Sequence, residues 1–308
     1  MSRPGAPLLV GAFVVLCLIW GTTWSVIRVG LAGIPPFSGV SLRFALAAGL
    51  LLILAGLLGV RLGKSRLERR LWVVNGLLSF AVSYGVVYWS EQWVPSGLAA
   101  VLFATYPLFV AMVAHFVLPA EALTRPEAWG IAAGFLGVGV IFSEDLSALG
   151  GPGVALAAAV MLVSPLASAV SSVAIKRWGG GIHPLSLTAV PMAIGAGVTG
   201  VIALITERER TFVWNAPSLA AVLYLALAGS AVTFTLYYWL LSHLPAKRLA
   251  LISYIIPVEA VLIGTAVGEP LTARVVAGAA FVVAGVALAV HRSPQDPQTG
   301  LPPSGDRD

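Results

Sequence analysis

Continuous apolar runs of about twenty residues, repeated along the whole chain, constrain this sequence most. A helix needs roughly 20 apolar residues to cross the hydrocarbon of a bilayer, whereas a strand of a membrane barrel shows short alternating segments. The runs here do not alternate, which predicts membrane-spanning helices and excludes a barrel. Ten segments qualify or nearly qualify: 8–30, 37–59, 71–90, 97–118, 127–142, 153–175, 184–205, 218–240, 249–267 and 272–290.

The composition excludes the other broad classes of protein. Of the 308 residues, 58% are hydrophobic and only 10% are charged. A soluble domain carries about a quarter of charged residues, because polar groups must cover its surface. The apolar content is also too high for a disordered chain. We therefore expect an all-α membrane protein, followed by a disordered cytoplasmic tail over 292–308.

The Lys and Arg residues predict the orientation in the membrane. With the N-terminus inside, 13 of the 18 Lys and Arg residues fall on the inner side and five on the outer side. By the positive-inside rule, both termini are cytoplasmic in a multi-pass protein of the inner (plasma) membrane. The net charge of +5 then reflects topology, and no nucleic-acid partner is expected.

The two halves of the chain repeat each other. At a shift of 148 residues, Pro36 aligns with Pro184 and Gly130 with Gly278. A consistent register over five helices is hard to obtain by chance, so we divide the chain into repeats at 1–148 and 149–291. Because five is an odd number, the second repeat enters the membrane from the opposite side. Such inverted pairs are typical of secondary transporters, which bind substrate near the midplane.

Three motifs carry a family resemblance. They are Trp20-Gly21-Thr22-Thr23-Trp24, Leu42-Arg43-Phe44, and the stretch from Glu91 to Leu108 with its Pro95-Ser96-Gly97 core. Over about residues 8–290 the chain resembles the EamA-like branch of the drug/metabolite transporter superfamily. The resemblance implies ten helices in two inverted halves, a central cavity lined by helices 1, 3, 4, 6, 8 and 9, and export of amino acids or related small metabolites.

Two alternatives stay open beside a metabolite exporter. A sugar-nucleotide or lipid-linked carrier would need several central cations to hold phosphate, whereas Arg28, Arg43 and Lys176 are expected toward helix ends. A non-transporting receptor or scaffold would give the inverted repeat no purpose. No motif of an enzyme, a metal site or a cofactor is found. The expected partners are a small-molecule substrate and the lipid bilayer, and the oligomeric state is left open.

Side chains on four of the predicted helices are candidates for lining the cavity. Residues three and four apart share one face of a helix, which groups aromatic residues into stripes in the first, third and eighth helices and serines in the sixth. Aromatic rings with hydroxyl tips suit amphipathic ligands, although helix packing is the alternative for each. The candidates are Trp20, Trp24, Tyr84, Tyr88, Ser168, Phe234 and Tyr238.

Glu259 is an acidic residue near the centre of a predicted span. A carboxylate at mid-membrane costs about 2.5–3.5 kcal/mol on insertion scales, so it should face the cavity or a partner. At a shift of 150, its helix face corresponds to that of Tyr106, which joins the candidates. We expect Glu259 to bind the substrate amino group or to carry a coupling proton; a neutral acid bonded to neighbouring backbone is the alternative.

Prolines and charged residues complete the set of expectations. Pro107 and Pro257 fall inside the fourth and ninth helices at equivalent positions, and are candidate hinges for gating; a static kink is the alternative. Gly130 and Gly134 are expected to pack closely against another helix. Mutual ion pairing at the outer rim is the favoured role of the charges Arg28, Arg43, Glu91, Glu144 and Asp145.

Overall fold

The computed structural model describes residues 5–118, 123–143, 149, 151–243 and 252–291, and every regular element within them is a helix. In lipid, a helix satisfies its backbone N–H and C=O groups internally, which is why apolar segments take this form. Several helices begin with proline, whose missing N–H is not needed in the first turn. Pro36, Pro107, Pro184 and Pro217 each occupy the first or second helical position.

Each expected segment contains helix, within a few residues of the expected bounds. The first half holds α1 (Ala6–Leu31), α2 (Pro36–Leu57), α3 (Arg66–Asn75), the π-helix η1 (Gly76–Ser83), α4 (Tyr84–Ser90), α5 (Ser96–Phe103), α6 (Tyr106–Val117) and α7 (Arg125–Phe142). The second half holds α9 (Val154–Met161), α10 (Val163–Trp178), α11 (Pro184–Thr206), α12 (Ala216–Ala226), the π-helix η2 (Leu227–Val232), α13 (Thr233–His243), α15 (Ile252–Ala266) and α16 (Ala273–His291).

Among the described residues, seven helical segments are long and apolar enough to cross a membrane. The three other expected segments correspond to α7, to α15 and to α16, of which the last two have apolar stretches of only Ile255–Ala266 and Ala273–Leu288. The protein is thus a multi-pass helical membrane protein, while ten crossings stay a prediction. The expected tail 292–308 lies outside the described residues.

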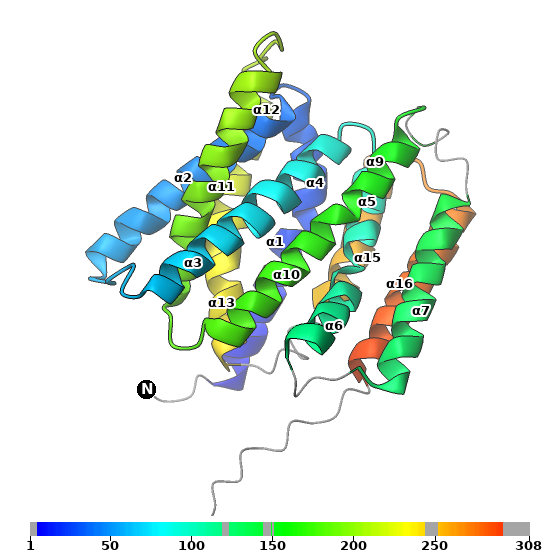
Figure 1. Cartoon of the computed structure of the whole chain (residues 1–308). Coiled ribbons are helices and arrows are strands. Elements are labelled where there is room, and N and C mark those ends of the chain that lie inside the picture. The colour runs from blue at the N-terminus through cyan, green and yellow to red at the C-terminus, as the bar shows by residue number, and fades with distance from the viewer. Residues whose placement is uncertain (1–4, 119–122, 144–148, 150, 244–251, 292–308) are drawn as a thin grey trace, which may run out of the picture.

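The helices form a bundle with a pair at each edge (Figure 1). α2 lies beside α11 at one edge and α7 beside α16 at the other, while the remaining helices fill the space between the pairs. α1 begins and α16 ends at the same end of the bundle. The two edge pairs therefore flank a centre that both halves of the chain build.

Glycines hold α7 and α16 together at backbone distance. A Cβ on Gly137 would lie 2.6 Å from the carbonyl oxygen of Gly278, and one on Gly285 would collide with the backbone of Gly130 and Gly134. This confirms the expected close packing of the Gly130–Gly134 motif. Gly130 and Gly278 are repeat mates, as are Gly137 and Gly285, so the contact is reciprocal. Reciprocal contacts of this kind are made across a two-fold axis.

Carboxylates at the two ends of the α2–α11 pair form a second reciprocal contact. Glu207, directly after α11, accepts hydrogen bonds from the backbone N–H groups of Phe37 and Ser38, both at 2.8 Å. Glu68 on α3, which is not the repeat mate of Glu207, accepts one from the hydroxyl of Ser186 at the start of α11. Ser38 and Ser186 are repeat mates. Each half therefore supplies a carboxylate that binds the first turn of a helix in the other half.

Two details of the helices differ from the expectation. The fourth predicted helix is interrupted at Ala104 and Thr105, and Pro107 lies in the first turn of α6 rather than inside a helix. Its mate Pro257 does lie inside a continuous helix, α15. The π-helices η1 and η2 were not expected at all, and they occupy equivalent places in the two repeats.

Candidate substrate-binding site

An aromatic cluster occupies the centre of the bundle. The ring of Phe234 on α13 lies 5.5 Å from Trp20 on α1, 5.0 Å from Phe80 on η1 and 6.1 Å from Tyr84 on α4, measured between centroids. Tyr237 lies 5.5 Å from Trp20 on its other side. The α-helical spacing therefore selected three residues that do lie together, namely Trp20, Tyr84 and Phe234. Phe80 and Phe234 are buried, whereas Trp20 and Tyr84 are half-buried.

A second group of rings joins α1 to α6. Trp24 lies 5.5 Å from Phe103, which stacks on Tyr106 at 5.9 Å with nearly parallel rings. The Tyr106 hydroxyl donates a 2.8 Å hydrogen bond to Ser172 on α10. The candidates Trp24 and Tyr106 thus lie in one chain of contacts, and the phenol has the partner that a buried hydroxyl requires.

Hydroxyl and amide groups line the side of the cluster toward α10. Ser168 donates to Ser83 at 2.9 Å, and Ser83 also bonds Ser164 at 2.7 Å. Asn75 accepts from Ser171 at 2.9 Å and donates to the Tyr238 hydroxyl at 3.2 Å. Ser168 and Tyr238 therefore belong to one polar band that joins α10 and α13 to the third predicted helix.

Glu259 projects from α15 against the backbone of α1. A Cβ on Gly21 would collide with the Glu259 carboxyl group, so the absence of a side chain at Gly21 is what lets the carboxylate lie there. Gly21 directly follows Trp20, which places the acid beside the aromatic cluster. The Glu259 side chain is half-buried, and the hypothesis of a substrate or proton role stays a prediction.

The expectation that Arg43 lies at the rim is wrong. Its side chain is 0% exposed, and its Nε donates to the Ser230 hydroxyl at 2.7 Å while Nη2 donates to the Gly229 carbonyl at 2.8 Å. The guanidinium also lies 4.9 Å from the centroid of the Tyr84 ring. Arg43 follows the start of α2 by seven residues, about 10 Å along the helix, and its long side chain reaches the π-helix η2.

Glu91 is buried next to this arginine without any hydrogen bond. Its side chain is 1% exposed, and neither carboxylate oxygen has a hydrogen-bond partner among the described residues. Burial raises the pKa of the Glu91 carboxyl well above its ordinary value, an effect that the nearby Arg28 guanidinium opposes. The expected pairing at the rim is thus only partly right. Arg28 pairs with another acid, and Glu144 and Asp145 lie outside the described residues.

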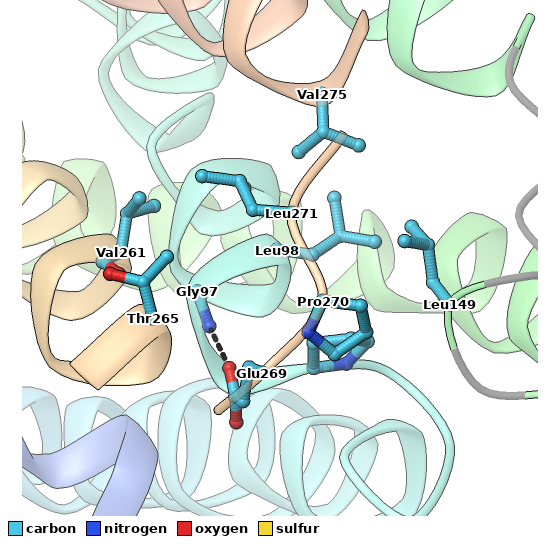
Figure 2. A pocket seen from close by; sticks show the side chains of 10 residues that line it. Gly97, Leu98, Leu149, Val261, Thr265, Glu269, Pro270, Leu271 and Val275 are labelled. Atoms are coloured by element: carbon cyan, nitrogen blue, oxygen red, sulfur yellow. Dashed lines mark hydrogen bonds between the residues drawn. The ribbon is translucent and has the colours of Figure 1, made fainter. Parts of the chain in front are cut away.

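That other acid, Glu269, fastens three segments at the predicted outer end of the bundle. Its carboxylate lies 3.5 Å from the Nε of Arg28 and accepts from the backbone N–H groups of Ser96 and Gly97 at 3.1 and 3.2 Å. Figure 2 shows the bond to Gly97 at the start of α5, beneath a small pocket of about 10 Å³. We call this contact the outer staple, because it ties the second half of the chain to α1 and α5.

Asn75, Ser83 and Phe80 belong to the site although sequence reasoning did not select them. Asn75 stands in an apolar segment, and a polar amide in a predicted span is a signal that it should face protein. Ser83 lies one position before the chosen Tyr84. The widened turns of η1 change which residues share a face, so the α-helical spacing did not group Ser83 with its partners.

Membrane-length helices around a buried aromatic and hydroxyl-bearing centre define a polytopic α-helical membrane protein. The chain belongs to the EamA-like transporter family, whose sequence profile matches residues 8–143 and again residues 155–291. The two matches show that the chain contains two copies of one repeat. The protein is accordingly a membrane transporter.

Its relatives come from bacteria and archaea. The chain is 35% identical over 266 residues to the uncharacterized inner membrane transporter YedA of Escherichia coli K12, covering 84% of this chain and 83% of that protein. It is 26% identical to the uncharacterized transporter YoaV of Bacillus subtilis, over 87% of this chain and 92% of YoaV. A crystal structure with 20% identity superposes with a TM-score of 0.64, covering 94% of this chain and all of that one, and shows the same fold.

Proposed function

We propose that the protein is a secondary transporter that exports amino acids or related small metabolites by alternating access. The observation that carries this proposal is the composition of the centre. Aromatic rings from α1, η1, α4 and α13 meet there, bordered by hydroxyl groups and one carboxylate. Rings with polar tips accommodate the apolar side chain of an amino acid, while the hydroxyl groups and Glu259 offer partners to its polar end.

The contributions of both halves to this centre support alternating access. Reciprocal contacts between α7 and α16, and between α2 and α11, are what an inverted pair of repeats would make. In that arrangement the two halves rock about the bound substrate. Pro107 and Pro257 are the proposed hinges: Pro257 removes a backbone hydrogen bond inside α15, and Pro107 directly follows the interruption of the fourth predicted helix at Ala104 and Thr105.

The orientation and direction belong to the same proposal. Lys and Arg predominate on one side of the predicted spans, which supports cytoplasmic termini in the inner (plasma) membrane. Export is taken from the family resemblance. The outer staple then closes the extracellular end of the site.

A sugar-nucleotide or lipid-linked carrier is the second candidate. The buried Arg43 removes the argument that the core contains no cation. Arg43 is nevertheless the single Lys or Arg that is fully buried among the described residues, whereas a diphosphate needs several such donors. An amino-acid carboxylate, with one charge, matches one arginine better.

Uptake into proteoliposomes tests the proposal. Purified protein is reconstituted and offered a panel of radiolabelled amino acids and two nucleotide sugars, with and without an imposed proton gradient. We expect at least one amino acid to accumulate above protein-free vesicles. If no panel member moves while circular dichroism and gel filtration show folded protein, the proposal is wrong; movement of the nucleotide sugars alone selects the second candidate.

A further inference from the structure

A buried arginine with an unfilled donor is the strongest unexplained feature of the molecule. Arg43 is fully buried, and a guanidinium carries five N–H donors and no acceptor. Nε and Nη2 are bonded, but Nη1 has no hydrogen-bond partner among the described residues. Burying a charge is costly unless it is paired and hydrogen-bonded. Among the described residues Nη1 is therefore left able to donate to an acceptor that arrives from elsewhere.

The surroundings of Arg43 supply a second open donor. Tyr88 on α4 is 3% exposed, its hydroxyl has no hydrogen-bond partner among the described residues, and the phenol interacts with the Arg43 guanidinium. Both donors are fixed in place. Ser230 and Gly229 of η2 hold the guanidinium, and the Tyr88 ring packs against Gly39 of α2. Two rigid donors side by side match the two oxygens of a carboxylate.

No acid among the described residues is bonded to Arg43. Glu91 interacts with Arg43, yet its oxygens have no hydrogen-bond partner among the described residues, and burial favours its neutral form. The described ion pair of this region joins Arg28 to Glu269 instead. Among the described residues, the positively charged Arg43 thus has no bonded counterion.

We propose that Arg43 and Tyr88 form the subsite for the carboxylate of the transported substrate. The inference rests on the proposed transport of amino acids and names the group that is recognised. Tyr84 links this subsite to the rest of the aromatic cluster, because its ring centroid lies 4.9 Å from the Arg43 guanidinium and 6.1 Å from the Phe234 ring. The carboxylate reaches Arg43 in a conformation in which the Tyr84 ring has moved aside.

Matched ligands that differ only in the carboxylate test the subsite. The ligands are phenylalanine, leucine and threonine together with their carboxamides. Tryptophan fluorescence of the purified protein measures their binding, and proteoliposomes measure their transport. We expect the wild type to bind the acid at least about tenfold more tightly than the amide, as a charge-assisted bond in a buried site would give. Arg43→Gln should reduce the ratio of acid affinity to amide affinity to about two.

Two further variants keep the test decisive. Tyr88→Phe removes one donor and leaves the Arg43 contacts to η2 intact, so it should reduce the ratio by about threefold even if Arg43→Gln fails to fold. Arg274→Gln removes an exposed arginine that bonds the Ser143 carbonyl, and should leave the ratio unchanged.

Four outcomes would overturn the proposal. An unchanged ratio in folded Arg43→Gln and Tyr88→Phe would do so. A second such outcome is that chloride binds at Arg43 and the amino acid does not displace it. Exchanging chloride for gluconate measures this, and the subsite would then hold an inorganic anion. If the wild type transports panel members without distinguishing acid from amide, this inference fails while the proposed function stands; if it neither binds nor moves any of them, both fail.

Discussion

Gly21 determines where the Glu259 carboxylate lies. The two residues meet between α1 and α15, and the space beside the glycine holds the carboxyl group. An alanine there would push aside the end of a flexible side chain rather than backbone, which the fold tolerates at small cost. The position of the acid can therefore be changed without removing the acid.

Gly21→Ala should lower transport by about tenfold, similarly to Glu259→Gln, because both remove the carboxylate from its place beside Trp20. Initial rates in proteoliposomes give the comparison. Gly11→Ala is the matched control on the same helix, since a Cβ there meets nothing within 4 Å. Wild-type rates and pH dependence in both Gly21→Ala and Glu259→Gln would make the acid a packing residue.

Trp20→Ala should weaken substrate binding by about tenfold while the protein stays folded, because the indole ring supplies apolar contact in the cluster. Its Nε1 is buried without a hydrogen-bond partner among the described residues, which leaves a donor for a ligand. Trp129→Ala on α7 is the control, as that side chain is 71% exposed at the surface of the bundle. Equal binding by both variants would contradict a binding role for Trp20.

Helical periodicity was enough to find Trp20, Tyr84 and Phe234, since Trp20 lies inside α1 and the other two lie at the starts of α4 and α13, just past the π-helices. It could not find the place of Arg43. The start of α2 was predicted to within one residue, but nothing in the sequence shows that a long side chain will cross to a carbonyl of η2. Distance along one helix is readable from spacing, whereas the partner on another helix depends on tertiary packing.

The glycines of α7 and α16 let the backbones of these two helices approach each other closely. Gly137→Ala should destabilise the protein by about 1–3 kcal/mol, because the added methyl group would meet the Gly278 carbonyl oxygen at 2.6 Å and the Val282 nitrogen at 2.7 Å. Thermal unfolding in detergent measures the loss. Gly139→Ala on the same helix meets nothing within 4 Å and should leave the melting temperature unchanged. A similar melting temperature for both would show that the pair separates easily.

Hydropathy predicted where the helices run, because the hydrocarbon demands about twenty apolar residues from each. It did not predict their irregular parts. The interruption at Ala104 and Thr105 and the two π-helices lie inside apolar sequence, where no charge or run of breakers marks them. Such features are stabilised by neighbouring helices, and so they depend on contacts that single segments do not contain.

For the molecule as a whole, the outer staple should control which side of the membrane the site faces. Glu269→Gln removes the ion pair to Arg28 and weakens the bonds to α5, so the predicted outer end should open more often. Leu98→Cys in a Cys17→Ser background reports this opening, since Leu98 is buried beside the pocket of Figure 2.

Labelling of that cysteine by an impermeant thiol reagent on whole cells should rise about tenfold when Glu269→Gln is added. Leu98→Cys with the native glutamate is the reference. Labelling only from the cytoplasmic side of inverted vesicles would reverse the proposed orientation, and no change on either side would show that the staple does not control opening.

The reciprocal carboxylates of the α2–α11 pair also have a consequence for biosynthesis. The amides at the start of α2 are synthesised about 170 residues before Glu207, which binds them. Until the second half has left the ribosome, these amides must rely on water and lipid headgroups. The first half therefore stays incompletely folded in the membrane until Glu207 is synthesised. A ribosome that stalls after α7 leaves a fragment in which the start of α2 lacks this partner, and quality-control proteases can recognise it.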